Sequence, residues 1–130
     1  MGVHPIYNPN DMYSARLLDH FQNPRHAGEI AHPDAMAEIE NPVCGDVLRL
    51  TVKVTDGRIS DARFKAKGCV PAMACASALT ELVVGKGLDE ARGVGRDDII
   101  AGVGSLPQAS SHAAQLALDV LSSALSQLKR

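Results

Sequence analysis

Tryptophan is absent from this chain of 130 residues, which contains only two Phe and two Tyr. A hydrophobic core therefore has to be built from Leu, Val, Ile and Ala. No apolar run approaches the roughly 20 residues that cross a membrane, and residues 1–10 contain no apolar core like that of a signal peptide. The net charge is −2 and no block of basic residues is present. We therefore expect neither a membrane nor nucleic acid as a partner.

Cysteine is also scarce. The chain has three cysteines, an odd number, and no two of them are spaced as Cys-x-x-Cys. Such a count does not suit a framework of disulfides, and nothing in the sequence indicates export. We expect a reduced, cytoplasmic setting in which the thiols are free or bound to metal.

The length suits one domain over residues 1–130, with residues 1–10 as a loosely ordered tail rich in Pro and Asn. The periodicity of the apolar residues predicts an α+β fold, in which a small three-stranded antiparallel sheet packs against several helices. The predicted strands span 35–40, 47–55 and 58–67. The predicted helices span 11–22 (with Asp11 as its cap), 70–84 and 107–129, with helical turns at 88–92 and 97–101.

The clearest pattern is the hairpin formed by the second and third predicted strands. Apolar and polar residues alternate along both, as expected of strands with one buried face. A two-residue turn would put the two apolar faces on opposite sides of the sheet. We therefore predict a three-residue loop, 55–57, with Gly57 in the left-handed position of a β-bulge. Leu48 then lies opposite Phe64.

This register brings reactive side chains to the open end of the hairpin. Continued outward, it puts Asp46 opposite Ala66 and Cys44 opposite Gly68, and Cys69 is the next residue. Two thiols that are 25 positions apart in the sequence thus come together beside a carboxylate. The pattern predicts this meeting without reference to any known protein.

We predict one metal or cluster site from four side chains: Cys44, Asp46, Cys69 and His112, the last of which lies near the start of the final predicted helix. Thiolates and imidazole suit tetrahedral zinc or iron, and thiolates are the usual ligands of iron–sulfur clusters. Asp46 is a hard, weak ligand beside soft ones. Such a ligand suits a site that must release its cargo.

Each of these residues also has an ordinary structural role. A single cysteine is commonly a small buried hydrophobic residue, Asp46 suits a turn or a cap, and His112 at a helix edge suits the surface or general packing. Cys75 lies in the apolar stripe of the helix predicted over 70–84, and we expect it in the core. The four histidines of the polar N-terminal third, among them His20, are expected to be solvated.

Four motifs along the chain match the sequence pattern of one protein family. They are LDHFQNPRHAG over 18–28, CGD over 44–46, the segment from Phe64 to Cys69, and Thr80-Glu81 followed by GKGLDEA over 85–91. Together they resemble the IscU-type proteins and the N-terminal domain of NifU, the scaffold family of iron–sulfur cluster assembly. The resemblance covers nearly the whole chain.

The resemblance implies a scaffold rather than an enzyme, with the same α+β fold. It implies that Cys44, Asp46, Cys69 and His112 hold a transient [2Fe–2S] cluster, for which a cysteine desulfurase supplies the sulfur and acceptor apo-proteins take the product. Zinc often occupies such sites. The resemblance leaves open a homodimer in which two chains share one cluster.

Two departures from the family pattern stand out. In the family a third cysteine directly follows the histidine, whereas Ala113 follows His112 here. Alanine cannot ligate a metal or accept sulfur, and Cys75, which lies where the family usually has serine, is expected to point into the core. In IscU-type members a dedicated chaperone binds the stretch Leu-Pro-Pro-Val-Lys. Only Leu106-Pro107 of that stretch is retained here, which argues against that partner.

Two other functions remain open at this point. One is a degenerate paralogue that binds zinc and acts through protein contacts. The other is a thiol-dependent enzyme in which Cys69 is the nucleophile, His112 the base and Asp46 the group that orients it. The enzyme hypothesis leaves Cys44 without a role, and the sequence shows no separate substrate pocket. We therefore place the scaffold first.

Overall fold

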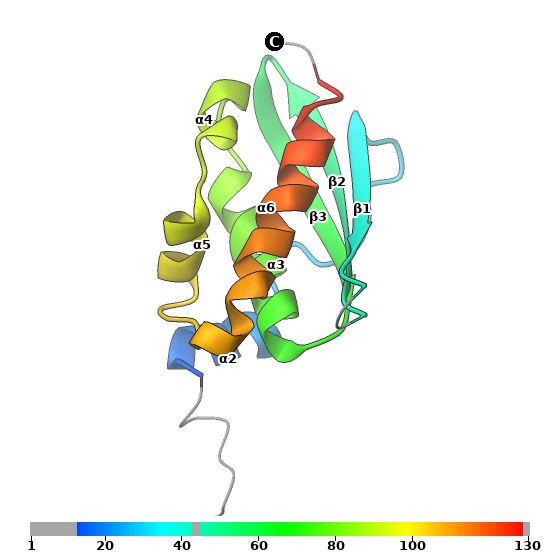
Figure 1. Cartoon of the computed structure of the whole chain (residues 1–130). Helices are drawn as coiled ribbons and strands as arrows, with labels where there is room; N and C mark the ends of the chain where they lie inside the picture. Colours follow the sequence, from blue (N-terminus) through cyan, green and yellow to red (C-terminus); the bar gives the residue numbers. More distant parts are fainter. Residues whose placement is uncertain (1–12, 43–44, 129–130) are drawn as a thin grey trace, which may run out of the picture.

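The computed structural model describes residues 13–42 and 45–128 (Figure 1). A three-stranded antiparallel sheet in the order β1-β2-β3 forms one layer. Its strands are β1 (Ala35–Glu40), β2 (Val47–Thr55) and β3 (Arg58–Lys67). The helices are α2 (Ala15–Gln22), α3 (Val70–Val83), α4 (Leu88–Arg92), α5 (Arg96–Gly102) and α6 (Ser111–Leu125), with a 3-10 helix, η1, over Gln108–Ser110. The predicted α+β fold is confirmed.

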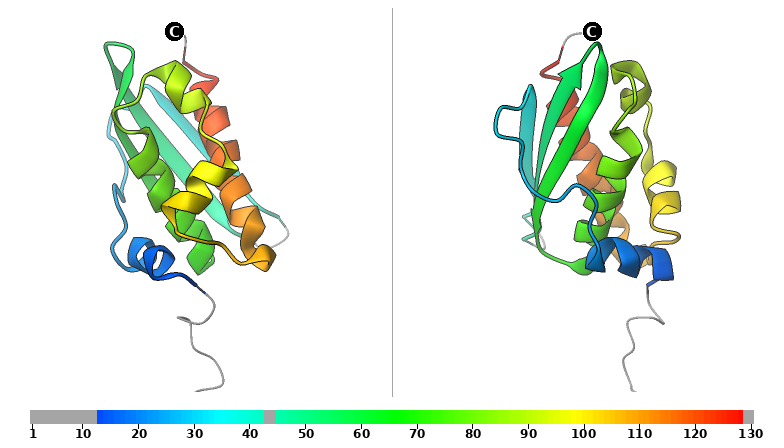
Figure 2. Two further views of the ribbon diagram at one scale, coloured as in Figure 1. Left: turned by 90° about the vertical axis from the view of Figure 1, so that its left-hand side faces the viewer. Right: turned by 180° about the vertical axis from the view of Figure 1, so that it is seen from behind.

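The helices cover one face of the sheet (Figures 1 and 2). Helix α3 packs on β3, and α6 packs on β1 and β2, while α2 and α5 contact α3 from the other sides. Because α3 is enclosed in this way, ten of its 14 residues are buried, and its small alanines allow its neighbours to approach closely. The core is built from Leu, Val, Ile and Ala, as the lack of aromatic residues predicted.

The β2–β3 hairpin closes differently from the prediction. Asp56 and Gly57 form a two-residue turn, and both have positive φ angles of 54° and 76°, as in type I′ turns. The register then shifts beside Lys53, where Ser60 is an extra residue on β3. The Ser60 hydroxyl donates to the Lys53 carbonyl at 3.2 Å, so the bulge supplies its own polar contact.

The two-residue turn and the bulge together place the register two residues away from the predicted one. Leu48 pairs with Ala66 and not with Phe64, so the predicted pairing was wrong. Because the shift is even, the apolar faces of both strands still point to the helices. For the same reason Asp46 does not lie opposite Ala66 but lies beside Gly68. The predicted position of Cys44 lies outside the described residues.

The connection between α2 and β1 runs past β3 and over the outer face of the sheet (Figure 2). The Gly28 N–H donates to the Phe64 carbonyl at 2.8 Å, and the Phe64 N–H donates to the His26 carbonyl at 3.1 Å. Further along, the Ile30 N–H donates to Thr51 Oγ1 at 3.1 Å. Thr51 is therefore buried although it lies in the polar row of β2.

The helix ends differ in detail from those predicted. Ser14 caps α2, since its Oγ accepts the Leu17 N–H at 3.0 Å and donates to the Val103 carbonyl. Asp11, the predicted cap, and the tail over 1–10 lie outside the described residues. Helix α6 begins after the 3-10 turn instead of at the predicted residue 107. Within residues 13–42 and 45–128, no helix is long and apolar enough to cross a membrane.

Candidate metal centre

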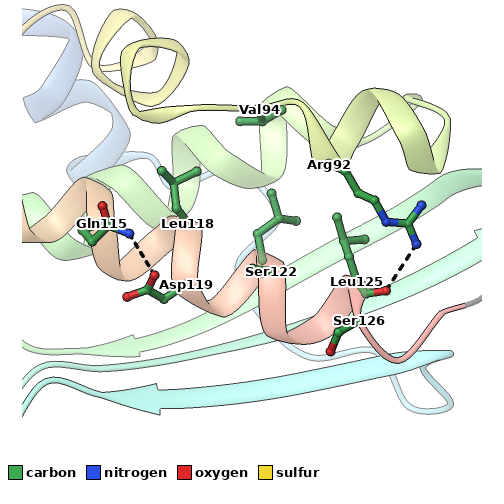
Figure 3. Close-up of a pocket in the computed structure, with 9 residues that line it drawn as sticks. Arg92, Val94, Gln115, Leu118, Asp119, Ser122, Leu125 and Ser126 are labelled. Atoms are coloured by element: carbon green, nitrogen blue, oxygen red, sulfur yellow. Dashed lines mark hydrogen bonds between the residues drawn. The ribbon is translucent and has the colours of Figure 1, made fainter.

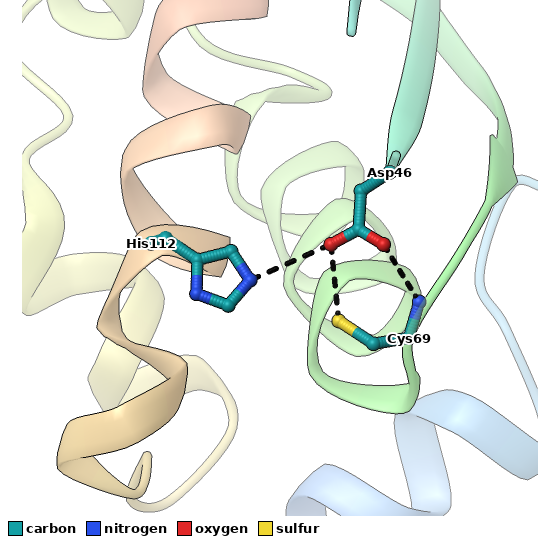
Figure 4. A group of neighbouring side chains, drawn as sticks. All are labelled: Asp46, Cys69 and His112. Carbon is teal, nitrogen blue, oxygen red and sulfur yellow. Dashed lines mark hydrogen bonds and ion pairs between the residues drawn. The ribbon is translucent and has the colours of Figure 1, made fainter. Parts of the chain in front are cut away.

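Three reactive side chains meet at one end of the sheet, where α3 and α6 begin (Figure 4). Asp46 directly precedes β2, Cys69 is the N-cap residue of α3, and His112 is the second residue of α6. One donor atom from each lies within 4.8 Å of the other two. The structure thus brings together three of the four predicted site residues, and the fourth, Cys44, lies outside the described residues.

Asp46 is at the centre of this group, and only 3% of its side chain is exposed. Its two oxygens have different partners. Oδ1 accepts the backbone N–H of Cys69 at 3.0 Å. Oδ2 accepts the S–H of Cys69 at 3.2 Å and lies 3.5 Å from His112 Nε2. A buried carboxylate needs partners of this kind, because burying an unpaired charge is costly.

The first turn of α3 also depends on Asp46. Cys69 makes no side-chain capping bond, and Pro71 in the first turn has no N–H that needs a partner. Asp46 supplies a cap from a different element, since its Oδ1 accepts the N–H of the N-cap residue. The start of a helix carries a partial positive charge, which favours both this carboxylate and a thiolate on Cys69.

His112 directs a nitrogen into the group. Its side chain is 37% exposed, yet Nε2 is buried and has no hydrogen-bond partner among the described residues. The 3.5 Å separation from Asp46 is longer than an ordinary N–H···O bond. Buried polar atoms normally have a partner. Because the donor atoms of His112, Asp46 and Cys69 all lie within 4.8 Å of one another, this nitrogen is placed to ligate a metal ion.

The donor set is one thiol, one imidazole and one carboxylate, which suits zinc or iron. In a tetrahedral site with bonds of about 2.0–2.3 Å, neighbouring donor atoms lie about 3.3–3.8 Å apart. The observed separations of 3.2 Å between Cys69 Sγ and Asp46 Oδ2, and of 3.5 Å between Asp46 Oδ2 and His112 Nε2, are close to this spacing. The three residues therefore fit a metal ion, and a fourth ligand would complete the tetrahedron.

Two neighbouring residues are not available to the site. Cys75 is 0% exposed in the middle of α3, and its burial, with a smaller effect from Cys69, raises the pKa of its thiol to about 12. Its predicted place in the core is confirmed. Ala113, which directly follows His112, is 1% exposed and packs in the core.

A second polar cluster, which the sequence did not reveal, joins α2 to α3. His20 was expected in solvent, but it is 4% exposed, and this expectation was wrong. Its Nδ1 lies 2.8 Å from Ser77 Oγ, which also accepts the Arg25 N–H at 2.8 Å. Burial, aided by the positive charge of Arg25, lowers the pKa of His20. Its spacing of three from Leu17, which puts both on one helix face, was the available signal.

The surface hollows add little to this picture. One of about 490 Å³ lies between α6 and the segment joining α4 to α5 (Figure 3), and its charged groups already have partners. Arg92 donates to the carbonyls of Leu125, the last residue of α6, and of Leu128 beyond it. Asp119 accepts from Gln115 at 2.9 Å. A second hollow of about 260 Å³ borders His112 between α6 and the end of β1. It leaves one side of this imidazole open to approach.

Known proteins resemble the chain over most of its length. Residues 12–130 match the family described as NifU-like N terminal domain. The chain is 42% identical over 114 residues to iron-sulfur cluster assembly scaffold protein IscU 1 of Archaeoglobus fulgidus, covering 88% of this chain and 74% of that protein. It is 40% identical over 121 residues to the scaffold protein IscU of Escherichia coli K12, covering 90% and 94%. The fold is shared with an N-terminal NifU-like protein from Brucella abortus, with a TM-score of 0.74 at 23% identity over 92% of this chain and 95% of that one.

Proposed function

This chain belongs to the family of NifU-like N-terminal domains, and on that premise we propose that it is a scaffold for iron–sulfur cluster assembly. The observation that carries the proposal is the meeting of Asp46, Cys69 and His112 at one end of the sheet. With Cys44 as a proposed fourth donor, the site has the four ligands that one [2Fe–2S] cluster needs. We assign the chain no reaction of its own as an enzyme.

The cargo of this site is iron with sulfide, held for a limited time. Cys69 would bind iron as a thiolate, and His112 would bind it through Nε2. Asp46 would contribute one oxygen, which holds iron less firmly than a thiolate does. A mixed set of this kind favours release of the cargo, as a scaffold requires.

We propose a cysteine desulfurase as the source of sulfur and apo-proteins as the acceptors of the finished cluster. In the sulfur transfer, the Cys69 thiolate attacks the outer sulfur of a persulfide on the desulfurase. The S–S bond of that persulfide breaks, the desulfurase cysteine leaves as a thiolate, and Cys69 then carries the persulfide. An external two-electron donor must reduce this persulfide to release its outer sulfur as sulfide and restore the Cys69 thiol. Cys69 is half-buried and can be reached, whereas Cys75 cannot. A reducing cytoplasm would keep the thiols of this site reactive.

Ala113 leaves the site without the third thiol expected from the family pattern. The proposed ligand set does not use one, because the carboxylate of Asp46 and the imidazole of His112 complete the count of four. A homodimer that shares one cluster would supply further ligands. The dedicated chaperone is not among the proposed partners, because the stretch after Leu106-Pro107 differs from the one that it binds in IscU-type members. Because Ala113 packs in the core, we expect Ala113→Cys to leave the yield of cluster unchanged, and a raised yield would mean that the number of thiols limits this site.

Zinc is the second candidate cargo, because a thiol, an imidazole and a carboxylate with donor atoms within 4.8 Å of one another also suit a zinc ion. In that case the protein would act through its contacts with other proteins.

Anaerobic reconstitution with iron, sulfide and a thiol tests the proposal. We expect sulfur-to-iron charge-transfer bands in the visible spectrum and acid-labile sulfide in the desalted protein, and both should be lost in Cys69→Ala. Cys75→Ala is the matched control and should retain both. A protein that shows neither signal, and that keeps zinc through dialysis, is a zinc-binding protein and not a cluster scaffold.

A further inference from the structure

Gly68 occupies a position where a side chain could be added only if Asp46 moved. Its φ angle is +142°, a backbone conformation that residues with a side chain rarely adopt. A Cβ atom built on Gly68 would lie 2.0 Å from Asp46 Oδ1, 2.7 Å from Asp46 Cγ and 3.0 Å from Asp46 Cα. The carboxylate of Asp46 therefore occupies the space that a side chain at this position would need.

The sheet explains why these two residues meet. Val47 pairs with Lys67 at the open end of the β2–β3 hairpin. Asp46 and Gly68 are the next residues outward on the two chains. Beyond Gly68 the chain turns into α3, with Cys69 as its N-cap residue.

We propose that Gly68 is the residue that positions Asp46 for the cargo, an inference that rests on the proposed function. Because Gly68 has no Cβ, the carboxylate of Asp46 reaches the Cys69 amide with Oδ1. The same placement directs Oδ2 toward Cys69 Sγ and His112 Nε2. Gly68 is also the chain neighbour of Cys69, but the atoms that a Cβ on Gly68 would meet all belong to Asp46, so we assign its positioning role to that contact.

The two oxygens of Asp46 thereby acquire separate tasks. Oδ1 stays on the backbone of Cys69 and keeps the start of α3 capped, while Oδ2 alone ligates the cargo. Asp46 is then a ligand through one oxygen. A ligand that binds in this way can leave the metal without uncapping the helix, which suits a site built for release.

The chain offers a matched control for backbone strain. Gly28 has a similar φ angle of +127°, but a Cβ atom built there would meet nothing within 4 Å. Gly28→Ala therefore imposes a comparable backbone penalty without touching the site. The difference between Gly68→Ala and Gly28→Ala measures the contact with Asp46.

Zinc affinity, measured by competition with a chelator, tests the proposal. Gly68→Ala should weaken zinc binding by about 10–100-fold, the range found for residues that orient metal ligands, and Gly28→Ala should change it by less than about threefold. In an Asp46→Ala background, where most of the collision is gone, Gly68→Ala should cost no more than Gly28→Ala does. With Co²⁺ as the probe, Gly68→Ala should retain the Cys69 charge-transfer band while its visible ligand-field bands shift. Equal losses in the two glycine variants, or an undiminished loss in the Asp46→Ala background, would overturn the proposal.

Unfolding of the metal-free variants in urea separates this inference from the proposed function. The clash between the Cβ added by Gly68→Ala and the Asp46 side chain does not require any metal. Gly68→Ala should therefore lower the free energy of unfolding more than Gly28→Ala does. This difference should disappear in the Asp46→Ala background. If the unchanged protein bound neither metal nor cluster, the proposed function would fail. In that outcome the urea series would still decide whether Gly68 holds Asp46 in place. If the effects of Gly68→Ala and Asp46→Ala on the free energy of unfolding simply added, this inference would be rejected.

Discussion

Two polar clusters lie inside this small fold, and the chain completes them to different degrees. In the cluster around His20, the imidazole meets Ser77 Oγ, and that oxygen also accepts the Arg25 N–H. In the cluster around Asp46, the carboxylate has its partners, but the buried Nε2 of His112 has no hydrogen bond among the described residues. The imidazole of His20 thus has a partner within the chain, whereas Nε2 of His112 has no hydrogen bond among the described residues.

This difference separates a structural cluster from a cargo site. A buried polar group without a partner lowers stability. Among the described residues His26 Nδ1 and Arg49 Nε also lack a hydrogen-bond partner, but of the three residues only His112 belongs to a group of possible metal donors. The His20 cluster joins α2 and the following loop to α3 and needs nothing from outside. The Asp46 cluster lies where four elements end or begin, and the donor it leaves open faces two others. Substitutions in the two clusters should therefore affect different quantities.

The largest effect should follow removal of the thiol at the cargo site. Cys69→Ala deletes one of the donor atoms, so zinc affinity should fall by more than about 100-fold, beyond the loss caused by changing a residue that only orients a ligand. The free energy of unfolding should change little, since the Cys69 N–H that binds Asp46 is retained. Chelator competition and urea unfolding measure the two quantities. Unchanged zinc affinity would mean that Cys69 is not a ligand.

Ser77→Ala should have the opposite profile. It removes the partner of His20 Nδ1 and of the Arg25 N–H, and we expect a loss of about 2–3 kcal/mol in the free energy of unfolding. Zinc affinity should stay within about threefold, because the site lies at another junction of the fold. Urea unfolding and chelator competition again report the two quantities. A large loss of zinc affinity would show that the two clusters are coupled.

The sequence predicted the elements of the fold well and one register poorly. Alternation along β2 and β3 defines which residues share a face, and the strands were predicted with their observed bounds. A three-residue loop and a two-residue turn with a bulge at Ser60 give registers of β2 on β3 that differ by two positions. Both keep the apolar residues on the inner face. Period-two alternation cannot choose between them, because only odd shifts move a side chain to the other face.

Asp46 and Cys69 come together despite that error for a physical reason, while the place of Cys44 lies outside the described residues. Both lie at the open end of the hairpin, and the shift of two residues moves Asp46 from its predicted place opposite Ala66 to a place beside Gly68, the residue before Cys69. The division of labour between the two oxygens of Asp46 could not be predicted, since it depends on the turn between β3 and α3. His20 was missed because one histidine in a short amphipathic helix fits either face until the packing of α2 on α3 is known.

Acidification should weaken the His20 cluster in a defined direction. The pKa of His20 is lowered in the folded protein by burial and by Arg25, against the opposing charges of Glu81 and Asp19. The unfolded chain takes up its proton near the ordinary value of 6.5 while the folded protein resists it. The stabilising contribution is therefore full above that value and is lost as the pH falls toward the lowered folded pKa.

Urea midpoints of the metal-free protein between about pH 7.5 and 5 measure this loss. His20→Gln, which does not titrate, should give a flatter profile over the same range. Equal slopes for the two proteins would assign the pH dependence to other groups.

The smallest effect should come from Cys75, the thiol that belongs to neither cluster. Cys75→Ala removes one buried sulfur atom from the core, and we expect a loss of about 1 kcal/mol, as for other small deletions in cores, with unchanged zinc affinity. Iodoacetamide at pH 8 should modify Cys69 in the folded protein, since the thiolate is the reactive form. The burial of Cys75 and its pKa of about 12 should protect it until the protein unfolds. Mass spectrometry of the alkylated peptides distinguishes the cysteines. Added zinc should slow the labelling of Cys69 and of Cys44, the proposed fourth ligand, but not that of Cys75. Rapid labelling of Cys75 in the folded state would mean that α3 opens, and the contrast between a closed core and an open cargo site would then lose its basis.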